Sequence, residues 1–344
     1  MRHLPRPIQY FLITLLLIMA CFPLYGEILI GNSQGFWMEQ LTHIMILAIV
    51  ALSLDLLVGV TGMVSLAQAA FFGLAGYTLV LYAPEFEAVS IWVGLPVVLI
   101  VSAAVALVMG LLIVRTSGIF FIMVTIAFSQ MFYYFFHDSS FAGGSDGLYL
   151  LMKPDVSIAG YQLLDLDNPR TVFYVALMSL VLIYLLLRTF MRAPFGRVLL
   201  GIKENEHRVQ AMGFKPLYYK LTVFIIAGMI SGYAGLLSVV QYGFVSPGQV
   251  SWLMSAHVLV MVIIGGIGSL FGAILGAFAF EGLHTLFSNL TKHWELPMGL
   301  VVIAIVVMLP KGIAGLLLDM GARFEKSSKE EDKPVALPLK RAAK

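Results

Sequence analysis

The stretch RAPFGRVLLGIKENEHRVQAMGFKPLYYK, residues 192–220, is a strongly charged interruption between long apolar runs. A segment this charged must lie in water, whereas the runs on either side are apolar enough to lie in a bilayer. Pro194 can begin a helix, because the N–H that proline lacks is not needed in the first turn. Gly213 can end one, since helices commonly stop at a left-handed residue. Apolar residues recur at helical spacing between them, so we predict a short amphipathic helix on the membrane surface.

The composition is that of an integral membrane protein. Apolar residues make up 60% of the chain and charged residues only 12%, with a mean hydropathy of +0.94. The single cysteine, Cys21, excludes an internal disulfide and makes a thiolate metal site implausible. The chain has no G-x-x-x-x-G-K-[ST] phosphate loop and no evident catalytic or metal-ligand cluster. We therefore expect no enzyme and no cofactor, and if ATP drives the process, another polypeptide binds it.

Ten apolar segments predict the fold class, an all-α polytopic bundle of about ten (8–10) transmembrane helices. They are roughly Ile8–Tyr25, Gln40–Val58, Leu66–Ala83, Ile91–Val114, Ile119–His137, Val172–Met191, Leu221–Gln241, Trp252–Ile264, Ser269–Phe287 and Leu296–Pro310. The eighth is short, so it either fails to cross fully or crosses as a helix broken at Gly265-Gly266.

The distribution of basic residues predicts the orientation of the chain. With ten crossings and a cytoplasmic N-terminus, all but three of the 21 Lys and Arg fall on the inner side. The exceptions are Lys153, Arg170 and Lys292. The positive-inside rule thus places both termini and the 192–220 loop in the cytoplasm. Eight crossings would also place both termini inside, so the rule leaves the number of spans open.

Residues 1–318 are predicted to form one transmembrane domain. Arg2, Arg6 and the run Ile-Met-Ala-Cys at 18–21 resemble a lipoprotein signal, but more apolar spans follow and we interpret the segment as an uncleaved first helix. Residues 319–344 are charged and poor in apolar side chains, which predicts a disordered cytoplasmic tail. We find no internal repeat in the sequence.

Three blocks of sequence resemble the branched-chain amino acid ABC-transporter permease family, on its LivM-type side. They are the 192–220 loop with the apolar residues that follow it, LDLLVGVTGMVSLAQAAFFGLAGY at 54–77, and GGIGSLFGAILGA at 265–277; a weaker one is RTSGIFFIMVTIAFSQMFYYFFH, followed by GGSDGL, within 115–148. The resemblance covers most of residues 45–315. It implies a multi-pass protein of the bacterial plasma membrane.

In such permeases the charged loop docks a short helix into a cleft on the ATPase subunit. The resemblance therefore implies coupling contacts from Arg197, Lys203, Glu204, Asn205, Glu206, Arg208, Ala211 and Gly213. Where the wider importer pattern has Glu-Ala-Ala, this chain has Glu204-Asn205-Glu206 and a later Ala211-x-Gly213. The apolar stripe of Ile202, Val209 and Met212 is expected to lie in the partner's groove.

Polar residues inside predicted spans should face the bundle interior, because ionisable groups are costly in lipid. Asp55, Gln68, His257 and Glu281 are candidates for lining the path of a zwitterionic solute, and His43 is a further ionisable group of this kind. The alternative is a structural role: a buried interhelical hydrogen bond for Gln68, and a satisfied pair near the outer interface for Glu281. Glu281 and His284 are three residues apart and can share a hydrogen bond.

Two glycine stripes predict close helix packing. Gly228, Gly232 and Gly235 form the first, and Gly268, Gly272 and Gly276 the second. Because lipid gives helices little hydrophobic drive to associate, small residues that let backbones approach supply the contact. Packing within the subunit is the plain interpretation, and a dimer seam or moving gate is the alternative.

These features favour the permease subunit of an ABC importer. Its expected partners are ATPase subunits, a second related permease subunit and an external solute-binding protein, in membrane lipid and without nucleic acid. The family implies branched-chain amino acids, with urea, amides or aromatic acids as alternatives. A stand-alone secondary transporter or channel remains the alternative of another class, and it would need midplane carboxylates and often an inverted repeat. A membrane-embedded enzyme is disfavoured, because the sequence shows no cluster of catalytic residues.

Overall fold

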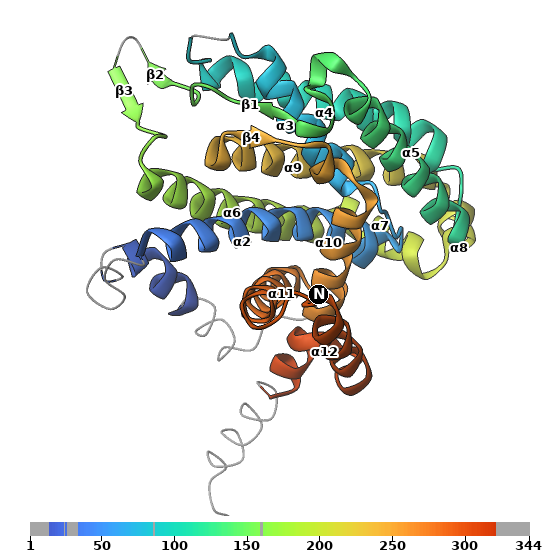
Figure 1. The fold of residues 1–344 in the computed structure, drawn as a ribbon. Coiled ribbons are helices and arrows are strands. Elements are labelled where there is room, and N and C mark those ends of the chain that lie inside the picture. The colour runs from blue at the N-terminus through green and yellow to red at the C-terminus, as the bar shows by residue number, and fades with distance from the viewer. Residues whose placement is uncertain (1–13, 24, 26–33, 85–86, 159–160, 321–344) are drawn as a thin grey trace, which may run out of the picture.

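The computed structural model describes residues 14–23, 25, 34–84, 87–158 and 161–320, and in this part the protein is an all-α bundle with two small pairs of strands (Figure 1). The main helices are α2 (Gln34–Asp55), α3 (Gln68–Tyr82), α4 (Ile91–Ile113), α5 (Ile119–His137), α6 (Pro169–Arg192), α7 (Pro194–Glu204), α8 (Glu206–Ala211), α9 (Pro216–Tyr242), α10 (Trp252–Gly265), α11 (Leu270–Leu290) and α12 (Glu295–Met308). The predicted tail lies outside the described residues from position 321 onward.

Each of the ten predicted apolar segments coincides with an apolar helix in the described part, but their lengths differ. Six are long enough to cross a membrane. Glu295–Met308 and Gly312–Met320 qualify only together, as a pair bent by 43°. Thr14–Pro23, α3 and α10 are shorter. The described part is thus that of an all-α membrane protein, with six helices, or seven with the bent pair, long and apolar enough to cross a membrane and three shorter apolar helices.

The long helix α2 runs through the centre of the bundle and ends in a π-helix, η2 (Leu56–Thr61). From Ile44 to Asp55 every residue of α2 is buried, and a helix buried all round in this way is typical of the centre of a membrane bundle. The π-helix stops at Gly62, whose φ of 75° is left-handed and whose N–H donates to the carbonyl of Leu57. A π-helix is rare and often marks a functional position.

Two sets of four helices, α2–α5 and α9–α12, pack in corresponding patterns. In the first set α3 and α4 pack against α9, and in the second α10 and α11 pack against α2. Gln40 near the start of α2 bonds Thr285 near the end of α11, and Gln241 at the end of α9 bonds the carbonyl of Glu39. The leading helices are thus antiparallel, which makes the second set an inverted copy of the first in packing. Sequence inspection missed this repeat.

The glycine pair at the end of α10 is a turn and does not break a continuing helix. Gly266 has a φ of 105° and Gly268 a φ of 84°, and α11 starts shortly after them. Gly265 then lies against Gly272, and Met261 against Gly276, so α10 and α11 run antiparallel. Of the two alternatives for the eighth apolar segment, the helix broken at Gly265-Gly266 is therefore wrong, because the backbone reverses direction there.

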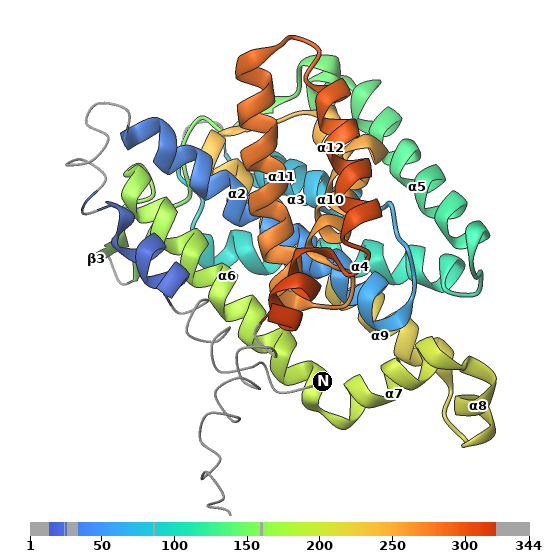
Figure 2. The same cartoon turned by 90° about the horizontal axis from the view of Figure 1, so that it is seen from below.

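The long loop after α5 carries turns and short strands at the end of the bundle opposite α7 and α8 (Figures 1 and 2). Strand β1 (Leu148–Tyr149) pairs antiparallel with β4 (Phe244–Val245). Strands β2 (Val156–Ile158) and β3 (Tyr161–Leu164) form a second antiparallel pair. Two 3₁₀ helices, η3 (Ser140–Ala142) and η4 (Gly144–Asp146), precede the strands of this loop, in keeping with its glycine and aspartate content.

Candidate functional site

Helix α3 begins at the buried Gln68, and its first turn meets the first turn of α10, where Ser255 is buried although Trp252 and Leu253 are exposed. The N–H of Ala69 donates to Ser255 Oγ at 2.9 Å, and Ser231 Oγ donates to the carbonyl of Gln68 at 2.7 Å. Ser53 Oγ donates to Gln68 Oε1 at 3.2 Å. Ser255 therefore satisfies the Ala69 N–H, one of the first-turn donors that helix geometry leaves without a partner, and the other two hydroxyl groups tie Gln68 to α9 and α2.

The segment from Gly62 to Ala67, which leads from η2 to α3, is irregular backbone that is exposed at Gly62 and buried in protein from Ser65 to Ala67. Leu66 donates its N–H to Thr125 Oγ1 of α5 at 3.1 Å, and Ala67 donates to Ser65 Oγ at 3.3 Å. Such backbone is tolerated at membrane depth only where protein or a watery cavity surrounds it. We call the meeting point of the starts of α3 and α10 with the 62–67 segment the junction; it combines irregular backbone with two helix starts.

Gln68 and Asp55 are both fully buried in this structure. Gln68 makes the interhelical hydrogen bond described above, which is the structural alternative for this residue. Asp55 Oδ1 accepts the Gly268 N–H at 2.7 Å, while its Oδ2 is buried without a hydrogen-bond partner. A Cβ atom on Gly59 would lie 2.5 Å from the Cα of Gly268, so only glycine lets η2 approach the α10–α11 turn this closely.

The charged segment forms two helices, α7 and α8, where one was predicted. The predicted start at Pro194 and the left-handed Gly213, with a φ of 88°, agree with the structure. Asn205 is extended between the helices, and its Oδ1 accepts the Arg208 N–H at 2.9 Å. An asparagine side chain that caps a new helix start favours a break over a continued helix. The Glu-Asn-Glu sequence therefore marks a corner (Figure 2).

The predicted apolar stripe is largely covered by the chain itself. Ile202 and Val209 are buried, whereas Met212 is 62% exposed. The expectation that all three lie in a partner's groove is therefore wrong for the first two, because they already pack inside this subunit. Phe214 and Tyr218 are exposed beside Met212 in the sequence. We call Met212, Phe214 and Tyr218 the tip patch.

The predicted coupling residues divide into exposed and engaged groups. Glu206 is engaged, because its carboxylate accepts from Lys220 Nζ of α9 at 2.6 Å. Lys203 lies at the surface, but its ammonium donates to the carbonyl of Gly59 in η2 at 2.8 Å. The remaining ones are exposed: Arg197, Glu204, Asn205, Arg208, Ala211 and Gly213. Sequence reasoning did not foresee the inward contact of Lys203, since nothing in the spacing relates residue 203 to residue 59.

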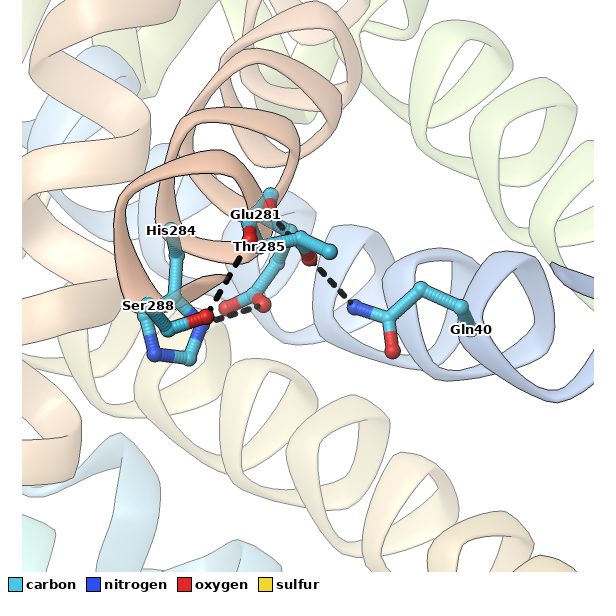
Figure 3. A network of polar contacts seen from close by, with 5 residues as sticks. All are labelled: Gln40, Glu281, His284, Thr285 and Ser288. Carbon is cyan, nitrogen blue, oxygen red and sulfur yellow. Dashed lines mark hydrogen bonds and ion pairs between the residues drawn. The ribbon is translucent and has the colours of Figure 1, made fainter. Parts of the chain in front are cut away.

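A second polar cluster lies in the last third of α11, between residues 281 and 288 (Figure 3). His284 Nδ1 lies 3.3 Å from Glu281 Oε2, the contact that their spacing predicts. Gln40 Nε2 of α2 donates to Thr285 Oγ1 at 2.9 Å, and Thr285 donates to the carbonyl of Glu281. Ser288 donates to the carbonyl of Thr285. Glu281 is buried, so this cluster joins α2 to α11 and keeps a carboxylate inside the protein.

Aromatic rings and histidines surround that cluster. The His257 ring is 5.7 Å from the ring of Phe280 and 6.4 Å from that of Trp294, and Trp294 is 4.4 Å from the His284 ring, all between centroids. His43 packs on Tyr242 and leaves its Nδ1 buried without a partner. The structure thus links His257 and Glu281 through the same aromatic and histidine side chains. Asp55 and Gln68 have different hydrogen-bond partners and are not part of this cluster. Sequence reasoning missed Gln40 and Trp294, which carry no motif.

The glycine stripes face neighbouring helices of the same subunit. In α9, Gly228 and Gly232 lie against Ala106 and Ser102 of α4, and Gly235 lies against the backbone of α3. In the second stripe Gly272 and Gly276 lie against α10. The prediction was wrong for Gly268, because this residue lies before α11 in the left-handed turn and is not part of that helix's stripe. Among the described residues, no group of three or more His, Cys, Asp or Glu is placed to hold a metal ion.

Comparison with known proteins fits this arrangement. Residues 37–309 match the family described as "Branched-chain amino acid transport system / permease component". The chain belongs to this permease family. It is 27% identical over 324 residues to the high-affinity branched-chain amino acid transport system permease protein LivM of Salmonella typhimurium, covering 89% of this chain and 74% of the relative.

The other relatives show the breadth of the family. The LivM protein of Escherichia coli K12 is 26% identical with the same coverage. The autoinducer 2 import system permease protein LsrC of Klebsiella pneumoniae is 28% identical over 126 residues, which cover 34% of this chain and 36% of the relative. No solved structure matches the chain.

Proposed function

We propose that this permease-family protein is the transmembrane subunit of an ATP-driven ABC importer for branched-chain amino acids. The observation that carries the proposal is the pair of helices α7 and α8, which lie at one end of the bundle and present an exposed, charged and partly apolar surface (Figure 2). The family match and the LivM relatives support it. ATP hydrolysis belongs to separate ATPase subunits, and a second permease subunit and an external binding protein complete the importer.

In this proposal all ten apolar helices lie within the membrane region, the shorter ones α3 and α10 as discontinuous helices. Both termini and α7–α8 face the cytoplasm, since the basic residues gather there. The protein is a multi-pass component of the bacterial inner membrane. The tip patch and the exposed charges of Glu204 and Arg208 contact the ATPase, where the charges mainly set register and partner choice.

Movement of the coupling helices reaches the interior through Lys203. Its hydrogen bond holds α7 to η2, and η2 leads directly into the irregular 62–67 segment and the start of α3. A π-helix that shifts its hydrogen-bond register moves the segment after it, so a displacement of α7 is transmitted to the junction of α3 and α10.

Transport by the purified chain in vesicles, with and without its ATPase subunits, tests the function. Branched-chain amino acids, urea, short amides, aromatic acids and autoinducer 2 form the solute panel. We expect uptake that requires ATP, the ATPase and the binding protein, with branched-chain amino acids preferred. Uptake of another solute under these conditions would overturn only the substrate class.

The secondary-transporter alternative gains one observation, the inverted packing of α2–α5 and α9–α12. That class commonly has such repeats. The same vesicles decide between the two, because a secondary transporter would move solute down an ion gradient without ATPase subunits. Such uptake would overturn the importer proposal.

A further inference from the structure

An apolar groove of about 360 Å³ lies between the helix Thr14–Pro23, α6 and α11, on the side of the bundle away from α3–α5. The α6 wall is one helical face that runs from Leu177 to Arg188. The other two walls are apolar side chains such as Leu16 and Phe271. The groove lining is aliphatic and aromatic except at one end, where Tyr184 and Arg188 lie.

We propose that this groove binds the acyl chain of an anionic phospholipid whose phosphate headgroup pairs with Arg188. The inference does not depend on the transported solute or on the ATPase. It rests on the shape of the groove, on its position along α6 and on the charge at its end.

The length of the groove fits one leaflet of a bilayer. At 1.5 Å per residue, the α6 wall from Leu177 to Arg188 is about 16 Å long. The hydrocarbon core of a bilayer is about 30 Å thick, so the groove spans about half of it. Arg188 lies one turn before the end of α6 at Arg192, beside the start of α7, which places the charged end at the membrane surface on the α7–α8 side.

The charge at that end lacks a protein counterion among the described residues. Their ion pairs do not include Arg188, whose side chain is half-buried at the mouth of the groove. Arg188 and Arg192 both lie within electrostatic reach of the Tyr184 hydroxyl. Basic pockets between transmembrane helices at this level suit anionic headgroups, and tyrosine is typical of the interface. A zwitterionic lipid would fill the groove but leave the guanidinium without a net countercharge.

The test uses the full chain in nanodiscs of phosphatidylcholine with or without phosphatidylglycerol. Native mass spectrometry measures the lipid retained by the protein, and the thermal unfolding midpoint measures its effect. We expect the wild-type chain to retain phosphatidylglycerol in preference to phosphatidylcholine. One arginine near the membrane surface is worth about 1 kcal/mol toward anionic lipid, so Arg188→Gln should lower this preference about fivefold.

Two further variants separate headgroup from acyl chain. Val181→Phe narrows the groove itself, and we expect it to reduce retention of both lipids without changing their ratio. Arg115→Gln is the matched control, because it removes a positive charge at the same end of the bundle from a residue that does not line the groove. It should leave both retention and preference unchanged.

Equal retention of the two lipids by the wild-type chain would overturn the proposal, as would an Arg188→Gln variant with an unchanged preference. If the isolated chain retains the lipid and the complete transporter does not, a partner subunit covers the groove and the lipid assignment is wrong. If Val181→Phe fails to fold, the Arg188→Gln and Arg115→Gln pair decides alone.

Discussion

Replacing Met212 with serine should weaken binding of the ATPase subunits while leaving the permease folded. Met212 is 62% exposed at the turn after α8, so its side chain has apolar surface available for a partner. Burying a whole methionine side chain is worth about 1.5–3 kcal/mol, and the exposed three-fifths correspond to about 1–2 kcal/mol. Since 1.4 kcal/mol is tenfold in affinity, Met212→Ser should weaken the ATPase about 5- to 30-fold.

The assay is titration of purified ATPase subunits onto the chain in nanodiscs, with the Kd as readout. Met152→Ser is the matched control, because Met152 is 50% exposed on the loop at the opposite end of the bundle. Both substitutions lie on the surface and should change the free energy of unfolding by about 0.5 kcal/mol or less. Only Met212→Ser should change the Kd.

An unchanged Kd for Met212→Ser would show that the tip patch is not the docking surface. A Kd that rises equally for both variants would trace the effect to general destabilisation. This design is sharper than a substitution at Gly213 or Glu206. Gly213 has a left-handed φ that any side chain would strain, and Glu206 pairs with Lys220, so either change would disturb the fold of the loop as well as docking.

Three further predictions follow from other contacts. Lys203→Met should leave the ATPase Kd unchanged but lower the amount of solute moved per ATP severalfold, whereas Lys203→Arg keeps a cationic donor and should retain more of this coupling. Equal solute moved per ATP in the wild type and both variants would refute transmission through Gly59. Gly272→Leu should lower the unfolding midpoint or abolish assembly, because a Cβ there would lie 2.6 Å from the Gly265 carbonyl oxygen, while Gly299→Leu, with nothing within 4 Å, should not. In a Cys21→Ser background, Ser157→Cys should react with an impermeant thiol reagent from outside and Gln210→Cys should not; reversed labelling would invert the topology.

The helices could be predicted from the sequence because bilayer thickness converts apolar length into a span. Six of the described helices meet that length, and the segments expected around α4, α5, α6, α9 and α11 all correspond to them. The apolar character of a segment does not reveal at what depth in the membrane its helix begins. The buried start of α3, where it meets the first turn of α10, depends on hydroxyl groups such as Ser231 and Ser255, and serine is small and frequent in any membrane helix.

Helical spacing predicted the apolar face of the 192–220 segment but not what covers it. Ile202 and Val209 fit an exposed docking stripe and a buried packing stripe equally well, since periodicity records only that one face is apolar. The structure buries both within the subunit and leaves Met212 exposed. The corner at Asn205 could also have been predicted, because asparagine is a preferred N-cap residue whose side chain accepts the N–H three residues later, here that of Arg208.

The inverted packing of the two helix sets was invisible in the sequence for a related reason. Membrane helices are constrained mainly to be apolar and to carry small residues at contacts, so two sets can share a geometry with little shared identity. The sets are not equivalent in one respect that bears on function. Among the described residues, only the first set has a π-helix, η2, at the end of its leading helix, and Lys203 of the charged segment bonds to it. In the proposed importer, an input applied to α7 reaches the start of α3 more directly than the start of α10, so we expect the first set to move first.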